Sequence, residues 1–379
     1  MELTDIRKEI DGIDNDILNL FLRRMTLSEQ VAEYKNAHNM PILNRERERQ
    51  ILADVQAKAG EKEEYAYHLF SRIIDLSRTR QNELLAAPSP VKALVERALS
   101  ASSGEVFPKT GTVACQGLEG SNAQAACDKL LPRGNIMYFK TFRAVADAVS
   151  SSLCKYGVLP IENSSNGSVR AVYELLLEQK TFIVRSTSLC IRHELLANPG
   201  VNLGNVTRIY SHPQAIGQCS HFLSTLPAVQ VIPCENTAVA AKLASEDESG
   251  QVAAIAAPQC KELYGLGSLQ TDIQDSDNNY TRFICIAKDP VIYSGSNRIS
   301  LVISCDNRPG ALSDILSRLS AHGVNMSKLE SCPVAGRNFE FIFFLELDAS
   351  VQDTGVLPLL ADLERICPGF SLLGSYAIV

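Results

Sequence analysis

The sequence predicts a multidomain protein in which an all-α helical unit, a two-lobed α/β domain and a small α+β domain follow one another. Three patterns lead to this fold class. Apolar residues recur at helical spacing over residues 1–86, and short apolar strands alternate with helical stretches over residues 111–288. Residues 297–379 show the β-α-β-β-α-β order of a ferredoxin-like unit. A chain of 379 residues is long enough for two or three such domains.

The composition argues against several classes of protein. A hydrophobic fraction of 45% with 21% charged residues describes a globular chain, and the net charge of -7 argues against a nucleic-acid partner, which needs a basic surface. The acidic start Met1–Asp5 is unlike a signal peptide, and no run reaches the roughly 20 apolar residues of a membrane span. We therefore expect a cytoplasmic protein without membrane contact. The eleven cysteines have no C-x-x-C spacing, so we expect reduced thiols and no metal site.

The first predicted helix carries an apolar stripe that is too long for its own domain to cover. The stripe begins at Leu3 and ends at Lys35, and Arg24 and Lys35 place two cations on the buried face. We expect the helix to run from an N-cap at Thr4 to about Asn36, on the order of 50 Å. Self-association would bury the stripe, so a homodimer or a higher homo-oligomer is predicted.

Polar and charged groups occupy the inward faces of the next two predicted helices. Asn44, Arg47 and Glu48 precede the apolar positions of the second helix, and Ser77 and Gln81 share the core stripe of the third. Any one of them could be a long side chain that reaches the edge of the bundle. Together with the two cations of the first helix they are too many to bury unpaired, so we expect a polar, dianionic ligand within the bundle.

Residues 1–86 resemble the all-helical chorismate mutase domain over essentially their full length. The rearrangement of chorismate to prephenate is a unimolecular pericyclic step that needs positioning and charge stabilisation but no cofactor. The resemblance implies Lys35 and Gln81 at the ether oxygen, and Glu48 with Asn44 at the ring hydroxyl, where the family often has Asp instead of Asn44. It also implies that Arg24, together with Arg7 reaching in from a partner protomer, holds the two carboxylates. Arg47 and Ser77 would complete the wall of the site.

Residues 87–110 are predicted to be a linker. The run Ala86–Pro90 ends the third helix, and Ser100–Gly104 is typical of a flexible crossing. We expect a short helix over Val91–Leu99 between them and assign it no function.

In residues 111–288, polar groups follow several apolar strands. The succession of strand Tyr156–Ile161, helix Val169–Leu177 and strand Thr181–Val184 predicts a mainly parallel sheet, and the length indicates two lobes with a cleft. The polar residues at the strand ends could either cap the helices that follow or bind a ligand, and both roles are compatible with the sequence. These are Ser121 after the turn Gly117–Gly120, Asn163 with Ser164, the run Ser211–Gln214, and Thr237 in Asn236–Ala238.

Thr281 and Arg282 stand side by side before the apolar run Phe283–Ala287, at the mouth of a predicted buried strand. Alone, the pair could be an ordinary strand residue and a surface charge. With the polar motifs just described, in the same order along the chain, this region resembles prephenate dehydratase. The resemblance implies that Thr281 protonates the departing ring hydroxyl as carbon dioxide leaves, while Arg282 holds substrate carboxylates. Further implied substrate contacts are Ser121, Asn163, Ser164, Ser211, Gln214 and Thr237.

One departure from the dehydratase pattern follows the glycine turn. Asn122 and Ala123 stand where that family usually has an aromatic residue and then a hydroxyl. A contact to the substrate is therefore expected to be lost or moved.

Two motifs in residues 297–379 resemble the phenylalanine-binding motifs of a regulatory ACT domain. The first is the turn Asn307–Leu312 and the second the strand end Leu329–Pro333, in which Cys332 replaces the usual arginine. A pairing module without a ligand is the alternative. The implied effector contacts are Asn307, Gly310, Ala311, Leu312, Glu330 and Ser331.

Taken together, the chain resembles the bifunctional chorismate mutase/prephenate dehydratase family with a C-terminal ACT domain. The resemblance implies conversion of chorismate to prephenate and then to phenylpyruvate, with phenylalanine as the feedback effector and no cofactor. The rival interpretation is a non-catalytic amino-acid sensor or solute-binding protein, because two α/β lobes and a sensing module would also suit such a receptor.

Overall fold

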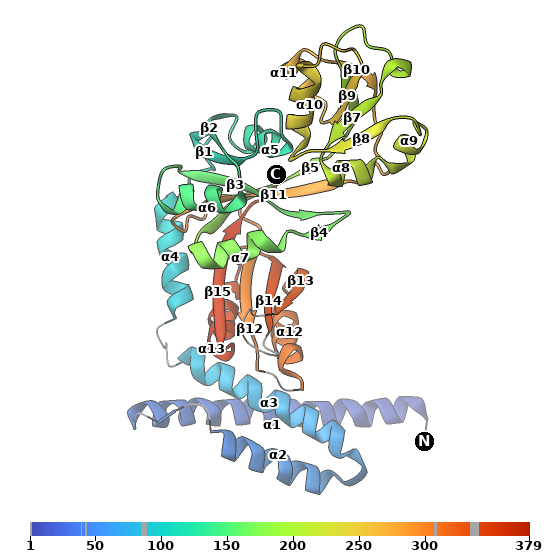
Figure 1. The fold of residues 1–379 in the computed structure, drawn as a ribbon. Helices are drawn as coiled ribbons and strands as arrows, with labels where there is room; N and C mark the ends of the chain where they lie inside the picture. The colour runs from blue at the N-terminus through green and yellow to red at the C-terminus, as the bar shows by residue number, and fades with distance from the viewer. Residues whose placement is uncertain (1, 39, 42–43, 85–88, 307–308, 334–340) are drawn as a thin grey trace. The chain divides into compact units, whose positions relative to one another are not determined.

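The computed structural model describes the chain except residues 1, 39, 42–43, 85–88, 307–308 and 334–340, which are grey in Figure 1. The chain divides into two compact units, Met1–Pro90 and Val91–Val379. We describe each unit by itself.

The first unit consists of three long helices, as the apolar periodicity predicts. The helices are α1 (Leu3–Ala37), α2 (Arg45–Ala59) and α3 (Glu63–Leu84), with the short 3-10 helix η1 (Gly60–Lys62) before α3. Glu2, and not Thr4, occupies the N-cap position of α1, and it makes no side-chain cap hydrogen bond. The prediction of Thr4 as the cap was wrong because the helix begins two positions nearer the N-terminus, about half a turn.

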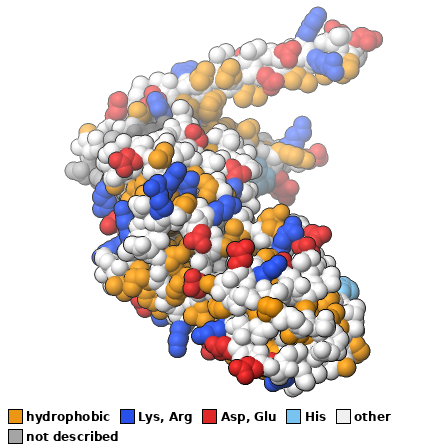
Figure 2. Space-filling view, turned by 90° about the horizontal axis from the view of Figure 1, so that it is seen from above, with side chains coloured by type: hydrophobic (Ala, Val, Ile, Leu, Met, Phe, Trp, Pro, Cys, Tyr) orange, Lys and Arg blue, Asp and Glu red, His pale blue; other side chains and the backbone are white. Residues whose placement is uncertain are grey.

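The apolar stripe of α1 lies open over its N-terminal half. Ile10, Ile13 and Ile17 are each about half exposed, whereas Ser28 and Ala32 further along the helix are buried. Figure 2 shows apolar side chains on the exposed part of this helix in orange. The helix is thus longer than α2 and α3 can cover, as its length suggests.

The second unit begins with a helix that packs into a core, where the sequence suggests a crossing. Helix α4 (Pro90–Ser102) contains the expected segment Val91–Leu99 and extends beyond it. Val91, Val95 and Ala98 are buried in the core of the C-terminal domain, and the backbone N–H of Val91 donates to Glu364 Oε1 at 2.9 Å. Most of the expected flexible linker is therefore a packed helix, because its apolar residues recur at helical spacing and find a core to cover.

The first α/β lobe is a mixed sheet with strand order β2-β1-β3-β11-β5. Strand β1 is parallel to β2 and β3, while β11 is antiparallel to both of its neighbours and the short β4 is antiparallel to β3. The strands are β1 (Thr110–Gln116), β2 (Arg133–Phe139), β3 (Tyr156–Asn163), β4 (Gly167–Ser168), β5 (Phe182–Cys190) and β11 (Tyr280–Ala287). The helices are α5 (Asn122–Leu130), α6 (Phe142–Ser150) and α7 (Arg170–Gln179).

The second lobe is inserted between β5 and β11 and has the strand order β10-β6-β9-β7-β8. The strands are β6 (Glu194–Ala197), β7 (Arg208–Ser211), β8 (Gln230–Pro233), β9 (Val252–Ala256) and β10 (Gly267–Gln270). The helices are η2 (Leu203–Asn205), α8 (Pro213–Gln218), α9 (Ser220–Ser224), α10 (Thr237–Ser245) and α11 (Gln259–Tyr264).

The expectation of a mainly parallel sheet was wrong in both lobes. Strand β7 pairs in parallel with β8 and β9, but β6 is antiparallel to β9 and β10. In the first lobe, β11 returns from the second lobe and enters between β3 and β5. A strand that arrives from another lobe needs no crossover helix, so the βα rhythm of the sequence does not reveal its direction.

The C-terminal domain has the ferredoxin-like order that the sequence predicts. Its elements are β12 (Arg298–Ser304), α12 (Ala311–Ala321), β13 (Asn325–Pro333), β14 (Phe341–Asp348), α13 (Val356–Ile366) and β15 (Gly369–Tyr376). They form an antiparallel sheet of order β13-β14-β12-β15.

Both faces of this C-terminal sheet are covered. Leu301 of β12 belongs to the core shared with α4, α12 and α13, while its neighbour Val302 belongs to a core shared with Tyr173 of α7. The chain end adds a backbone tie, because the N–H of Ser186 in β5 donates to the carbonyl of Ala377 at 3.0 Å. The sheet is therefore packed directly on the first α/β lobe, and β14 and β15 lie beside α7 in Figure 1.

Candidate active sites

A cavity of about 270 Å³ lies between the three helices of the first unit. It is lined by every residue predicted for the helical site except Arg7: Arg24, Lys35, Asn44, Arg47, Glu48, Ser77 and Gln81. Helical spacing explains the convergence, since each helix turns these positions to the same side. Three cations and one carboxylate of the predicted set thus share one hollow.

Hydrogen bonds hold the cavity wall formed by α1 and α3. The Arg24 guanidinium donates to Ser77 Oγ, and Gln81 Nε2 donates to Ser28 Oγ at 2.7 Å. Burial lowers the pKa of the Arg24 guanidinium below its ordinary value. Within the described part of the chain, the buried Oε1 of Gln81 has no hydrogen-bond partner. Buried polar atoms are normally hydrogen-bonded, so this oxygen is available to a polar ligand in the cavity.

The wall formed by α2 carries a second polar group. Asn44 caps α2, since its side-chain oxygen accepts from the backbone N–H of Arg47 at 3.0 Å. Glu48 pairs with Arg78 of α3 at 3.4 Å. Asn44 Oδ1 is thus engaged at the start of the helix, and capping accounts for part of its role.

Sequence reasoning missed two residues that line this cavity, Ser28 and Arg78. Helical spacing could have found both of them. Ser28 follows Arg24 by four positions, and Arg78 follows Ile74 by four, so each lies on the predicted inward face.

Arg7 does not reach this cavity within its own chain. It is exposed on α1 and precedes Arg24 by 17 positions, which corresponds to about 25 Å along the helix axis. Its contribution from a partner protomer stays a prediction.

In the α/β region, the structure brings Asn163 and Thr281 into direct contact. They lie opposite each other on β3 and β11, and Asn163 Nδ2 donates to Thr281 Oγ1 at 2.9 Å. Asn163 Oδ1 accepts from the backbone N–H groups of Ser165 and Asn166 at 3.1 and 3.0 Å. Two backbone donors can face only the carbonyl oxygen of the amide, so the amino group must point toward Thr281.

Ser164 supports the same strand ends. Its hydroxyl donates to the carbonyl of Asn278 at 2.8 Å and accepts from the backbone N–H of Tyr280 at 2.9 Å. The hydroxyl thus donates one hydrogen bond and accepts another, and Ser164 joins the ends of β3 and β11 in this conformation.

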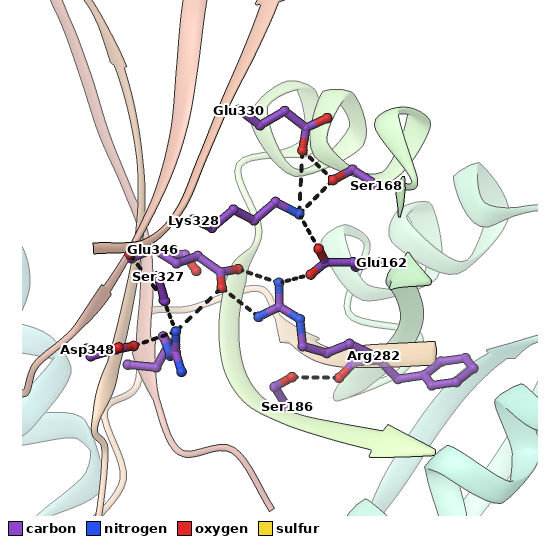
Figure 3. Close-up of polar contacts among 12 residues, drawn as sticks. Glu162, Ser168, Ser186, Arg282, Ser327, Lys328, Glu330, Glu346 and Asp348 are labelled. Carbon is purple, nitrogen blue, oxygen red and sulfur yellow. Dashed lines mark hydrogen bonds and ion pairs between the residues drawn. The ribbon is translucent and has the colours of Figure 1, made fainter. Parts of the chain in front are cut away.

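Arg282 does not share the site of Thr281, contrary to the sequence prediction. Its side chain is 12% exposed and forms two hydrogen bonds of 2.7 Å with Glu346 of β14 and one of 2.8 Å with Glu162 of β3 (Figure 3). Successive side chains of a strand point to opposite faces, and the prediction overlooked this alternation. The guanidinium therefore lies between the α/β lobe and the C-terminal sheet.

Several other predicted contacts have structural roles. Ser121 caps α5 by accepting from the backbone N–H of Gln124, and Ser211 is fully buried and donates to the carbonyl of Ile255 at 2.8 Å. Asn236 caps α10 in front of the half-buried Thr237, while Gln214 is exposed on α8. Capping, one of the two alternatives for the strand ends, is thus observed at Ser121 and Asn236.

The glycine turn before α5 brings the two lobes together. A Cβ at Gly120 would meet Cys260 Sγ and a Leu263 methyl group at 3.0 Å, and Cys260 Sγ contacts the Gly120 carbonyl at 3.3 Å. Asn122 Oδ1 accepts from Gln259 Nε2 at 3.5 Å. The turn and Asn122 therefore touch α11 of the second lobe, while Ser211, Gln214 and Thr237 share no hydrogen bond with Asn163 or Thr281 among the described residues.

The predicted effector site is described only in part, because Asn307 lies outside the described residues. Gly310 is the N-cap residue of α12 and has a φ of 82°, a left-handed conformation that favours glycine; the buried Ala311 and the half-buried Leu312 follow it. On β13, the Glu330 carboxylate accepts from the hydroxyl of Ser168, and Ser331 is exposed.

Cys332 lies in the core between the C-terminal sheet and the α/β lobe. It is 5% exposed, and burial raises the pKa of its thiol. A buried position in this core suits a small apolar side chain better than an arginine without a partner.

The described residues contain neither a membrane-spanning helix nor a cluster of metal ligands. No helix among them is long and apolar enough to cross a membrane. No group of three or more His, Cys, Asp or Glu side chains there could hold a metal ion.

Comparisons with known families follow the same division of the chain. Family models match for chorismate mutase type II over residues 6–82, prephenate dehydratase over residues 113–291 and the ACT domain over residues 299–365. The fold and these family matches therefore define a multidomain biosynthetic enzyme with a regulatory domain.

The similarity to full-length relatives extends over nearly the whole chain. The chain is 32% identical to the bifunctional chorismate mutase/prephenate dehydratase of Aquifex aeolicus, over 99% of this chain and 98% of the relative. It belongs to the bifunctional chorismate mutase/prephenate dehydratase family. The rival interpretation as a non-catalytic sensor is not favoured.

Two of the solved structures that resemble the chain have sequence identities of 28% and 30%. One is a prephenate dehydratase from Arthrobacter aurescens in complex with L-Phe, with 30% identity and a TM-score of 0.64 over 70% of this chain and 90% of that one. The other is described as GqqA, a novel type of quorum quenching acylase, with 28% identity and a TM-score of 0.65 over 71% of this chain and 98% of that one.

Proposed function

We propose that this enzyme performs its two reactions at two separate sites and that the residues above carry them. The chorismate mutase domain converts chorismate to prephenate, and the prephenate dehydratase domain converts prephenate to phenylpyruvate in phenylalanine biosynthesis. The assignments of individual residues rest on the geometry of each site.

The helical cavity carries the mutase assignment. Chorismate is a dianion, and Arg24, Lys35 and Arg47 surround the hollow with positive charge. Negative charge builds on the ether oxygen as its bond to carbon breaks, and Lys35 with Gln81 would stabilise it. Glu48 and Asn44 would orient the ring hydroxyl, Arg24 would hold a carboxylate, and Ser77 would complete the wall.

The Asn163–Thr281 hydrogen bond carries the dehydratase assignment. Because Thr281 Oγ1 accepts from Asn163, its own proton is directed elsewhere, and Thr281 Oγ1 donates no hydrogen bond to the described residues. Thr281 would donate this proton to the departing ring hydroxyl of prephenate, while carbon dioxide leaves and the ring becomes aromatic. Ser121, Ser164, Ser211, Gln214 and Thr237 remain proposed substrate contacts that would require the site to rearrange. Arg282 is not among them, because its guanidinium is paired with Glu346 and Glu162.

Replacement of Thr281 by valine tests this assignment with little change of shape. We expect Thr281→Val to lower kcat for prephenate by roughly 10²-fold or more, with a small change in KM, because only the proton donor is lost. Formation of phenylpyruvate, followed by its absorbance, measures both constants. A kcat within a few-fold of the parent would show that Thr281 only packs.

Phenylalanine is the proposed effector of the ACT domain. Supporting observations are the glycine turn at Gly310, which allows the backbone to approach an amino acid, and the relative whose structure contains L-Phe. Cys332 lacks the charge of the arginine usual there, so we expect weaker coupling between effector and active site than that arginine gives where it has a partner. Calorimetry with phenylalanine on this protein measures binding, and absence of binding would leave the domain as a pairing module.

A further inference from the structure

Two neighbouring cross-strand pairs lie at the N-terminal end of β11. Thr281 lies opposite Asn163, and Arg282 lies opposite Glu162 in the same ladder. Because side chains alternate along both strands, the two pairs occupy opposite faces of the sheet. The first pair is assigned to dehydration, and the second meets the ACT sheet (Figure 3).

The ACT domain supplies a buried carboxylate and an ammonium group to the second pair. Glu346 of β14 is 6% exposed and holds the Arg282 guanidinium with two hydrogen bonds of 2.7 Å. Lys328 of β13 approaches Glu162 Oε1 at 3.2 Å and donates to Ser168 Oγ at 2.6 Å. Paired charged hydrogen bonds of this kind fix the direction of both partners.

Opposite charges favour the ionised forms of Arg282 and Glu162. Burial acts to lower the pKa of the Arg282 guanidinium, but Glu346 raises it above its ordinary value. Burial acts to raise the pKa of the Glu162 carboxyl, but Arg282 and Lys328 lower it below its ordinary value. Each charge is thus stabilised by the opposite charge that faces it.

The backbone ladder is interrupted directly beside the two pairs. Arg282 is in register with Glu162, but Phe283 is in register with Pro160, so Ile161 is an extra residue in β3. Pro160 has no N–H group to donate to the ladder. A bulge of this kind redirects side chains and weakens local pairing, so side-chain contacts gain importance for the register at the strand mouth.

We propose that Glu346 of the ACT domain is a positioning residue for dehydration. By holding Arg282 against Glu162, it fixes the neighbouring Thr281 and Asn163 in the geometry that frees the Thr281 proton. The active site of the dehydratase therefore includes the ACT sheet in its supporting framework. This inference rests on the proposed role of Thr281.

The test uses Glu346→Gln in the full chain, which keeps the shape of the side chain and removes its charge. We expect kcat for prephenate to fall about tenfold, with KM within about threefold, because a displaced donor reduces turnover more than binding. Turnover of chorismate by the other unit should stay at the parental value and serves as the internal control. Arg282→Lys keeps the charge but removes the two-pronged contact, and should show the same loss.

Two comparisons separate positioning from a general loss of stability. Asp362 pairs with Arg318 at 2.8 Å, is buried to the same degree as Glu346 and lies in the same domain. Asp362→Asn should leave kcat for prephenate within about twofold, since this pair is not joined to Arg282. In a Thr281→Val background, Glu346→Gln should have no further effect, because the donor that it positions is already absent.

The proposal is overturned if Glu346→Gln keeps parental kcat, or if Asp362→Asn lowers kcat equally. It is also overturned if the losses of Glu346→Gln and Thr281→Val multiply in the double variant. Parental turnover of Thr281→Val alone would reject Thr281 as the donor, and any loss in Glu346→Gln could then not act through it.

Discussion

At the residue scale, the amide of Asn163 determines what Thr281 can do. Two backbone N–H groups hold its carbonyl oxygen, so its amino group donates to Thr281. An amide donor at this position leaves the Thr281 proton available, whereas an acceptor would take it.

This reasoning predicts the effect of Asn163→Asp, a replacement of almost identical shape. We expect kcat for prephenate to fall at least about tenfold near pH 7, because the aspartate would accept a hydrogen bond from the Thr281 hydroxyl and direct its proton away from the substrate. Steady-state formation of phenylpyruvate measures the loss, and thermal unfolding confirms that the variant is folded. Turnover within about twofold of the parent would contradict the proposed direction of the hydrogen bond.

The sequence indicated which residues stand at the site better than it indicated where their side chains point. Thr281 and Asn163 could be predicted to converge because each stands at a strand end beside a polar motif. The neighbour Arg282 was assigned to the same site because adjacency in sequence was treated as adjacency in space. The alternation of strand side chains places it on the other face. Its partner Glu346 is 64 residues away in the ACT domain, and no local pattern reveals such a contact.

At the element scale, helix α1 is longer than the other helices of its unit can cover. Its periodicity predicted both its length and the cations that it contributes to the cavity, since helical spacing depends only on local sequence. The packing of α4 against the ACT core could not be predicted in the same way. Its apolar residues indicate a helix, but not which distant surface they cover.

The exposed stripe of α1 predicts a consequence for assembly and for the mutase. Ile13→Glu should dissociate the proposed homodimer and lower kcat for chorismate, because Arg7 would no longer arrive from the partner protomer. Light scattering gives the mass, and consumption of chorismate gives the activity. Asn15→Glu adds the same charge to the opposite side of the exposed helix and should change neither. A monomeric parent, or a variant that stays dimeric and active, would refute the shared mutase site.

At the scale of the whole molecule, the two proposed sites lie in different units of the chain. The mutase cavity lies within Met1–Pro90, and the Asn163–Thr281 pair lies within Val91–Val379. The ACT sheet packs on the dehydratase lobe, so we expect effector binding to act first on dehydration.

The most direct test compares Lys35→Ala and Thr281→Val on chorismate and on prephenate. Lys35→Ala should consume chorismate slowly, because loss of a charge-stabilising donor raises the activation free energy by on the order of 2.7 to 4 kcal/mol. The same variant should convert added prephenate at the parental rate. Thr281→Val should consume chorismate normally and accumulate prephenate. An equal mixture of the two variants should form phenylpyruvate from chorismate again. Loss of both activities in either variant, or no recovery in the mixture, would contradict two separate sites.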